Sequence, residues 1–288
     1  MKVMILGAGG FLGSRLCKSL RNNEIIKCGR DKKNDIILDK TKKNNFTDIL
    51  LKVKPDVIIN LIAIADVDSC ERKKEEANKV NNIMVKEFVR TIKESKLTNK
   101  IFFLHISTDQ VYSGNGPHKE NFTRPENIYA KTKLKGEKYI KKINGCVIRT
   151  NFIGKSLTKK KSLSDWIYQS LKKNKRINAF KNVKFSPLNI ETLCAYINLI
   201  IKNKISGIYN LGSKNGFSKA EFVLKFAKKL NLNTNLIKFI DYKKNMLLAK
   251  RPLDMRMNVK RFENRFNVVL KDLNYEINLL SKEYKKIK

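Results

Sequence analysis

Tyr129 and Lys133 are the two side chains whose types and spacing best suit proton transfer. Pro125 and Asn127, just upstream, suit the start of a helix, and residues four apart on a helix lie on one face. A free phenol has a pKa near ~10 and is a poor proton donor or acceptor at neutral pH. A cation held beside it favours the phenolate and lowers that pKa, so the pair could move a proton onto or off a substrate oxygen. In a lysine-rich chain the same spacing also arises by chance, and its meaning depends on the elements that precede it.

A glycine-rich turn near the N-terminus could hold a diphosphate. A short apolar run is followed by Gly7-x-x-Gly10-Phe11-Leu12-Gly13 and then by a helical pattern. Glycines let the backbone turn tightly and approach a pyrophosphate, which then lies among the free N–H groups of a helix N-terminus. Strand, glycine turn and helix in this order favour a nucleotide-binding turn, with these residues as its contacts, over a plain strand–helix connection.

The residues after the next strands indicate which dinucleotide is bound. A strand at 24–28 is followed by Gly29 and then Arg30, whose guanidinium suits a 2′-phosphate, whereas an NAD site usually has a carboxylate there. The sequence therefore predicts NADP (NADPH), and the neighbouring Asp31 leaves NAD open. The carboxylate of Asp39, at the end of the third strand, could reach the adenine ring. Small Ala63 would allow close backbone contact with the cofactor.

Apolar segments alternate with helical patterns through the first half of the chain. This alternation is typical of the α/β class, with a Rossmann-type doubly wound parallel sheet. Ligands of such sheets bind outside the carboxyl ends of the strands, where Gly7, Ala63 and Thr108 all fall. The expected elements are strands 3–6, 24–28, 35–39, 56–60, 101–106 and 146–149, with helices 46–53 and 75–95 and one from Tyr129.

Beyond about residue 150 the pattern loosens into shorter elements. A helix is expected over 163–173, and Ser218 begins another with Glu221 at its capping-box position. The sequence therefore predicts an NADP-binding Rossmann domain over residues 1–150 and a smaller C-terminal α/β substrate-binding lobe over 151–288. Some segments of the second part are expected to return to the first.

Composition excludes several classes of protein. The 288 residues are 42% hydrophobic, as in ordinary globular proteins, and no run reaches the ~18 apolar residues of a membrane helix. A cytoplasmic location without membrane insertion is expected. The five cysteines are scattered and odd in number. His105 lies in an apolar run and His118 in a polar loop, so no metal site is expected.

The net charge of +36 could indicate a nucleic-acid partner. The excess is mostly lysine, spread over nearly every helix, and few aromatic residues interleave with it. A compositional bias that gives solvated lysine faces explains this better, and no nucleic-acid partner is expected. The charge would still attract anionic ligands such as nucleotide phosphates.

Together these residues resemble the extended short-chain dehydrogenase/reductase family, and within it the nucleotide-sugar enzymes similar to dTDP-4-dehydrorhamnose reductase. The likeness covers nearly the whole chain, and the motifs are specific for the family only in combination. They are Gly7-x-x-Gly10-Phe11-Leu12-Gly13, Gly29-Arg30, Asn60 to Ala63 with Val67-Asp68 and Glu71, Ser107-Thr108-Asp109-x-Val111-Tyr112, Tyr129-x-x-x-Lys133, Gly136-Glu137, Arg149-Thr150, Gly212-Ser213 and Arg251-Pro252.

The resemblance implies catalytic roles for Thr108, Tyr129 and Lys133. Thr108 would hydrogen-bond the reacting carbonyl and contact substrate, and Tyr129 would give the carbonyl oxygen a proton as hydride arrives from the nicotinamide. Lys133 would bind the ribose hydroxyls and lower the pKa of Tyr129. Tyr129 and Lys133 are therefore also expected to contact the cofactor. Phe152 and Arg251 are the other candidates for sugar contact.

The resemblance leaves more than one activity open. Gln110 stands where the family's dehydratases have a glutamate, and an amide cannot abstract a carbon-bound proton, so reduction is favoured over elimination. The leading hypothesis is an NADPH-dependent reductase of a nucleotide-linked 4-keto-sugar, serving surface polysaccharide precursor synthesis. The alternatives are an NAD-dependent nucleotide-sugar epimerase and a non-catalytic regulatory subunit with the same fold. The expected partner is the nucleotide-sugar itself, and the chain could form a homodimer.

Overall fold

The computed structural model describes residues 1–38, 46–158, 160–243 and 245–286, and the chain divides into two compact units. Unit 1 comprises Met1–Thr108, Asn127–Arg149 and Cys194–Ile208; unit 2 comprises Asp109–Glu126, Thr150–Leu193 and Tyr209–Lys288. The sequence predicted two parts divided at residue 150, with later segments returning to the first. In the structure the units are interleaved in both directions, because 109–126 belongs to unit 2 and 194–208 to unit 1.

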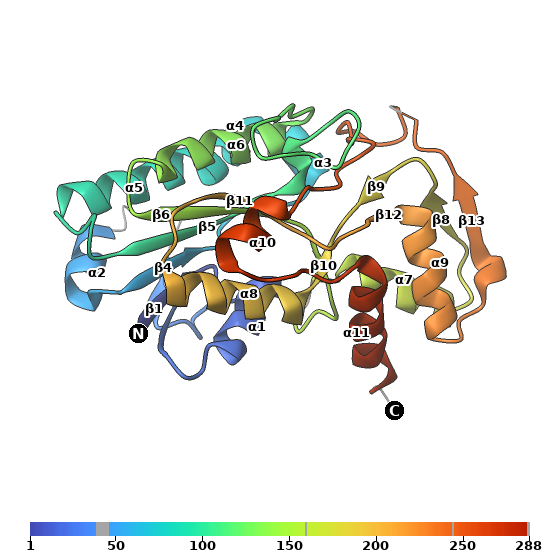
Figure 1. Cartoon of the computed structure of the whole chain (residues 1–288), viewed down its shortest axis with the longest axis horizontal. Helices are drawn as coiled ribbons and strands as arrows, with labels where there is room; N and C mark the ends of the chain where they lie inside the picture. Colours follow the sequence, from blue (N-terminus) through green and yellow to red (C-terminus); the bar gives the residue numbers. More distant parts are fainter. Residues whose placement is uncertain (39–45, 159, 244, 287–288) are drawn as a thin grey trace. The chain divides into compact units, whose positions relative to one another are not determined.

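A seven-stranded sheet within the described residues has the order β11-β6-β5-β4-β1-β2-β3 (Figure 1). The pairs β1–β2, β2–β3, β1–β4 and β4–β5 are parallel. This order matches the Rossmann pattern, in which the direction of strand succession reverses between the first and fourth strands. The predicted doubly wound α/β fold is confirmed. The strands are β1 (Lys2–Leu6), β2 (Glu24–Gly29), β3 (Ile36–Ile37), β4 (Val57–Asn60), β5 (Phe102–Thr108), β6 (Gly145–Thr150) and β11 (Gly207–Leu211).

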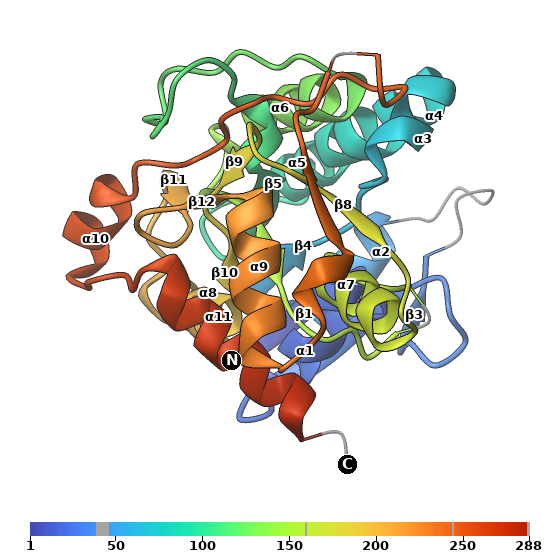
Figure 2. The same ribbon diagram turned by 90° about the vertical axis from the view of Figure 1, so that its right-hand side faces the viewer.

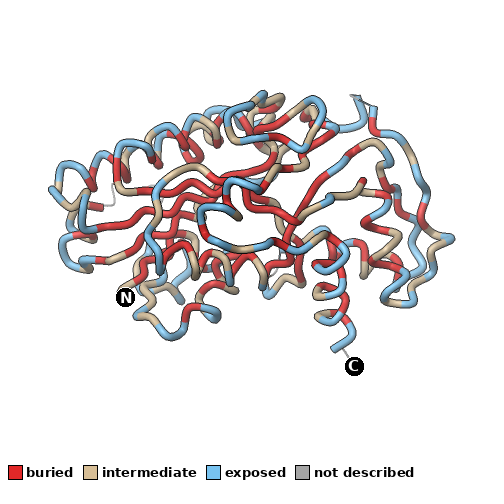
Figure 3. Tube along the Cα trace, viewed as in Figure 1, coloured by how far each residue is buried: buried red, intermediate tan, exposed pale blue. Residues whose placement is uncertain are grey.

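Helices cover both faces of this sheet. The helices α5 and α6 lie on one face and α1 on the other, as Figures 1 and 2 show from two directions. The central strands are buried along their length (Figure 3), which explains their continuous apolar sequences. The helices are α1 (Phe11–Ser19), α2 (Phe46–Val53), α3 (Val67–Arg72), α4 (Lys74–Asn78), α5 (Met84–Glu94), α6 (Ile128–Ile140) and α8 (Ile190–Asn203).

The core under α2, α5 and α6 is built from apolar side chains at helical spacing. Phe46 of α2 and Phe88 of α5 pack with ring centroids 4.5 Å apart, above Met4 and Leu6 of β1. Each such side chain contributes ~1.5–3 kcal/mol when fully buried. The expected single helix over 75–95 is instead α4, a π-helical turn η1 (Lys79–Ile83) and α5 in succession. The π turn includes the buried Asn81.

Unit 2 has its own core and short sheets. Parallel pairs join β10 with β7 and β13 with β8, and an antiparallel pair joins β12 with β9. The predicted capping box of Ser218 and Glu221 begins α9, and a second capping box begins α7. The elements are η2 (Asp109–Val111), β7 (Phe152–Ile153), α7 (Leu163–Lys172), β8 (Ile177–Phe180), β9 (Lys184–Phe185), β10 (Leu188–Asn189), β12 (Phe217–Ser218), α9 (Lys219–Lys229), η3 (Thr234–Leu236), β13 (Ile237–Ile240), α10 (Lys260–Phe266) and α11 (Leu273–Lys285).

Candidate active site and nucleotide-binding loop

The glycine turn after β1 has the close packing that its spacing predicted. Gly7 has a φ of +89°, a conformation that favours glycine. A Cβ on Gly13 would lie 2.4 Å from the carbonyl oxygen of Gly7, so only glycine lets α1 approach the turn this closely. Gly10 is the N-cap of α1, and no side chain of the described residues caps that end. The N-terminus of α1 is therefore built to receive an anion.

The ends of β1 and β4 meet beside this turn. The backbone N–H of Leu61 donates to the carbonyl of Leu6 (2.9 Å), and a Cβ on Gly7 would lie 3.3 Å from the carbonyl carbon of Leu61. The chain after β4, which includes half-buried Ala63, is held by the buried Asn81. The amide of Asn81 accepts from the N–H of Ile64 (2.9 Å) and donates to its carbonyl (3.1 Å). Gly7 and Ala63 thus flank the point where strand order reverses, where such sheets bind dinucleotides.

Arg30 is exposed just beyond the end of β2. The carboxylate of Asp31 accepts from the backbone N–H of Lys33 (3.0 Å), and its carbonyl accepts from the amide of Asn34 (2.7 Å). Asp31 therefore takes part in its own turn, and Arg30 is the side chain at the strand end that suits a 2′-phosphate. Asp39, predicted to reach the adenine ring, lies outside the described residues.

The helix that bears Tyr129 and Lys133 begins as its sequence suggests. Asn127 is the N-cap of α6, and its side chain accepts from the N–H of Ala130 (2.8 Å). The N–H of Ile128 donates to the carboxylate of Glu71 (2.8 Å). Half-buried Tyr129 therefore lies in the first turn of α6, one helical turn before Lys133.

Lys133 is buried against β5. Its Nζ donates to the carbonyl of Ile106 (2.7 Å) and lies 3.3 Å from Nε2 of His105. Thr108, the last residue of β5, is two positions beyond Ile106 and also buried. Thr108, Tyr129 and Lys133 all belong to unit 1, where α6 packs on β5.

Burial changes the proton affinity of this site. It lowers the pKa of Lys133 from 10.5 to about 8, and the charge of Glu137, one turn along α6, acts in the opposite direction. For His105, burial and then the charge of Lys133 hold the pKa well below its ordinary value of 6.5. His105 is therefore neutral near neutral pH, whereas Lys133 changes charge close to it.

A buried ion pair fixes α6 to the neighbouring strands. Arg149 of β6 donates to both carboxylate oxygens of Glu137, the shortest contact being 2.6 Å, and Ser107 of β5 donates to the same carboxylate (2.5 Å). A Cβ on Gly136 would lie 2.5 Å from the carbonyl oxygen of Asn81, so α6 also approaches the π turn closely. The Gly136-Glu137 and Arg149 motifs thus position the helix that bears Tyr129 and Lys133.

Phe152 and Arg251, the other predicted substrate contacts, belong to unit 2. Both are half-buried, and the guanidinium of Arg251 donates to the carbonyl of Ala249 (2.8 Å). Gln110, also in unit 2, donates to the sulfur of Met255 (3.2 Å). The contact of Phe152 and Arg251 with the sugar stays a prediction.

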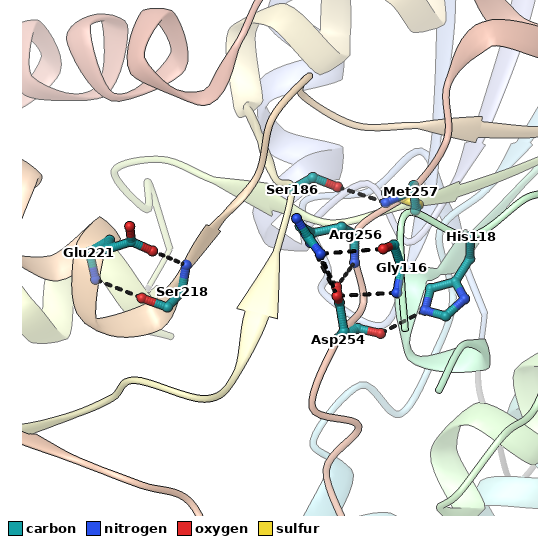
Figure 4. Close-up of polar contacts among 8 residues, drawn as sticks. All are labelled: Gly116, His118, Ser186, Ser218, Glu221, Asp254, Arg256 and Met257. Atoms are coloured by element: carbon teal, nitrogen blue, oxygen red, sulfur yellow. Dashed lines mark hydrogen bonds and ion pairs between the residues drawn. The ribbon is translucent and has the colours of Figure 1, made fainter. Parts of the chain in front are cut away.

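His118, expected in a polar loop, is buried within unit 2. Its ring stacks on Tyr112 with centroids 5.0 Å apart, and Nε2 lies 2.8 Å from the carbonyl oxygen of Asp254 (Figure 4). Arg256 binds both oxygens of the same aspartate, which also accepts from the N–H of Gly116. His118 does lie in a loop, and the loop composition gave no sign of its burial, because the polar groups that satisfy it lie far away in the sequence.

Asn60 and His105 lie next to Lys133 of the candidate site, and the sequence interpretation gave them no role. They are register partners on β4 and β5, and the amide of Asn60 lies 3.1 Å from Nδ1 of His105. The signal available in the sequence was Asn60 at the end of one apolar strand and His105 among the apolar residues of the next. In the described part of the chain, no cluster of His, Cys, Asp and Glu could hold a metal ion. No described helix has the length and apolar character needed to cross a bilayer.

The parallel sheet, its glycine turn at the reversal of strand order and the Tyr-x-x-x-Lys helix against β5 define an oxidoreductase of the short-chain dehydrogenase/reductase class. The chain belongs to the family described as the RmlD substrate binding domain, whose model matches residues 1–286. The resemblance inferred from the motifs is thereby confirmed.

Individual relatives agree with this assignment. The chain is similar to dTDP-4-dehydrorhamnose reductase of Escherichia coli K12, with 25% identity over 287 residues and 94% of each chain covered. The crystal structure of a hypothetical dTDP-4-dehydrorhamnose reductase from Sulfolobus tokodaii is 31% identical, with a TM-score of 0.84 over 96% of this chain and 99% of that one. The NADP complex of the Bacillus anthracis reductase has a TM-score of 0.87 at 22% identity, over 98% and 100% of the chains, which shows the fold alone.

Proposed function

We propose that the chain is an NADPH-dependent reductase of a nucleotide-linked 4-keto-sugar, of the dTDP-4-dehydrorhamnose reductase kind, in the synthesis of surface polysaccharide precursors. The observation that supports this most directly is the position of Lys133. Lys133 lies one helical turn from Tyr129, and its amine is buried against the carbonyl of Ile106. Ile106 is two residues before Thr108. The family match and the similarity to the Escherichia coli enzyme support the choice of substrate class.

The residues at the strand ends fit an NADP molecule. Gly7 and Gly13 bring backbone and α1 together where a diphosphate could be held, and exposed Arg30 follows β2 where a 2′-phosphate would lie. The Bacillus anthracis relative holds NADP in its crystal structure. When bound, the reduced cofactor supplies the hydride.

The protein's own groups would then supply position and the proton. Thr108 would hydrogen-bond the sugar carbonyl, and Tyr129 would donate a proton to the oxygen as it becomes a hydroxyl. Lys133 would bind the cofactor ribose and lower the pKa of the phenol. Gln110 is an amide and cannot act as the base that elimination of water requires. A cytoplasmic location and a homodimer stay predictions from the sequence.

The test is incubation with NADPH and a panel of nucleotide-linked 4-keto-sugars, following the loss of reduced nicotinamide. Net oxidation is expected with at least one member. Interconversion of sugars without net oxidation would instead assign the chain as an epimerase. Inertness across the panel, with NADPH bound, would favour the regulatory subunit.

Tyr129→Phe removes only the hydroxyl and should lower kcat by about 10²–10⁴-fold, the usual contribution of a general acid. NADPH binding, measured by nicotinamide fluorescence, should remain. Tyr139→Phe is the matched control, because Tyr139 lies on the same helix and packs against the apolar core of unit 1. It should leave kcat within about twofold. Full activity of Tyr129→Phe would reject the proposed mechanism.

A further inference from the structure

A chain of buried polar groups leads from the backbone after β4 to Lys133. The N–H of Ile62 lies 3.1 Å from Oδ1 of Asn60, Nδ2 of Asn60 lies 3.1 Å from Nδ1 of His105, and Nε2 of His105 lies 3.3 Å from Nζ of Lys133. Asn60, His105 and Lys133 are 1%, 0% and 2% exposed. All of these groups lie in unit 1. Without competing water, the donors and acceptors in this chain must match.

The direction of each hydrogen bond follows from the first one. A backbone N–H can only donate, so Oδ1 of Asn60 must face Ile62 and the NH₂ group must face His105. Nδ1 of His105 therefore accepts. Because burial, the larger cause of its lowered pKa, keeps His105 neutral whatever the charge of Lys133, its single proton is on Nε2, on the side of Lys133.

The N–H donor on His105 determines which protonation state of Lys133 can form a hydrogen bond with it. An ammonium group has three donors and no acceptor, whereas an uncharged amine has one lone pair. Nζ already donates to the carbonyl of Ile106. The contact with Nε2–H is therefore a hydrogen bond only when the amine is uncharged and accepts it.

We propose that His105 is a positioning residue: fixed as its Nε2–H tautomer by Asn60, it donates to the uncharged amine of Lys133 and so sets the pH at which Lys133 becomes the cation that activates Tyr129. The role of Lys133 in this statement rests on the proposed reductase function. The tautomer does not, because it follows from the hydrogen bonds of unit 1 alone.

The other groups around Lys133 act in known directions. Burial lowers its pKa, in the same direction as the donor on His105. Glu137 acts in the opposite direction, but this carboxylate is paired with Arg149 and accepts from Ser107. Tyr129 lies on the same face of α6, and a cationic Lys133 would lower the pKa of its phenol.

The tautomer can be measured directly by long-range ¹H–¹⁵N NMR on the folded full-length protein. Only two histidines are present, and His118→Gln assigns the remaining signals. We expect the Nδ1 of His105 to be the unprotonated nitrogen from about pH 6 to pH 9. A protonated Nδ1, or an imidazolium in this range, overturns the proposal whether or not the chain reduces a sugar.

Asn60→Asp tests the consequence for Lys133. The near-isosteric carboxylate still accepts from Ile62, but its other oxygen now accepts from His105, which moves the proton to Nδ1 and leaves Nε2 as an acceptor. The ammonium form becomes favoured, and the alkaline limb of the pH profile of kcat/KM should move up by ~1 pH unit or more. Asn203→Asp, an equal charge change at the exposed end of α8, should leave the limb in place.

The added charge must be separated from the change of tautomer. In a His105→Phe background, Asn60→Asp can act on Lys133 through its charge only, so the shift should fall to less than half. An equal shift in both backgrounds overturns the role of His105. Failure of every keto-sugar to react rejects the proposed function, and the NMR result then decides the tautomer by itself.

Discussion

Lys133 is buried, although the proposed function needs its amine in the charged ammonium form. Its amine is enclosed between α6 and β5 and finds its partners in His105 and in the carbonyl of Ile106. Moving an ammonium group out of water is costly, so the folded protein binds this proton less tightly than the unfolded chain does. The burial that lowers the pKa of Lys133 therefore also lowers the stability of the folded state at neutral pH.

This cost predicts how stability depends on pH. Between about pH 8, where folded Lys133 loses its proton, and about 10.5, where the unfolded residue does, the unfolded state binds more protons. The free energy of unfolding contributed by Lys133 should therefore rise with pH across this window and be flat below it. Urea unfolding of the wild type and of Lys133→Met at pH 7 to 10 measures this contribution as a difference. The contributions of other groups cancel in it, such as that of Lys219, whose pKa burial also lowers to about 8. A difference that stays constant with pH would contradict a depressed pKa.

At the scale of elements, the site depends on close approaches that leave no room for a side chain. The helix α1 meets the carbonyl of Gly7 at Gly13, and α6 meets the π turn at Gly136. The ion pair of Glu137 and Arg149 then fixes α6 to β6. Close backbone approaches and this side-chain ion pair thus hold the glycine turn and the Tyr129 helix in place.

Gly13→Ala should destabilise the protein by about 1–3 kcal/mol or more, because its Cβ would lie 2.4 Å from a backbone oxygen that cannot move freely. Gly9→Ala is the matched control in the same turn. A Cβ there meets no heavy atom of the described residues within 4 Å, and the change should leave stability within about 1 kcal/mol or raise it slightly. Chemical denaturation of the two variants compares them. Equal stabilities would show that α1 does not pack on the turn as described.

At the scale of the whole molecule, the sheet could be predicted because its central strands β4 and β5 are buried along their length and are mostly apolar. The capping box of Ser218 and the helix start at Asn127 could be predicted for a different reason, because a cap depends only on side chains within three residues along the chain. The partnership of Asn60, His105 and Lys133 could not, since it depends on the register of β4 against β5 and on the packing of α6. The burial of His118 and the interleaving of the two units likewise depend on contacts between distant segments.

The net charge of +36 predicts how the whole molecule meets its cofactor. The Debye length falls from about 30 Å at 0.01 M salt to about 8 Å at 0.15 M, so the summed attraction for an anion is screened over this range. NADPH has one more phosphate than NADH, and its dissociation constant should rise more steeply with salt.

In Arg30→Ser the preference for NADPH over NADH should fall by about tenfold, the effect of losing ~1.4 kcal/mol of charged hydrogen bonding. Because only one of many charges is lost, the salt dependence of NADH binding should be unchanged, and fluorescence titrations at both salt concentrations measure the two effects separately. Loss of the salt dependence together with the preference would place the attraction at Arg30 alone and exclude a contribution from the lysine-rich surface.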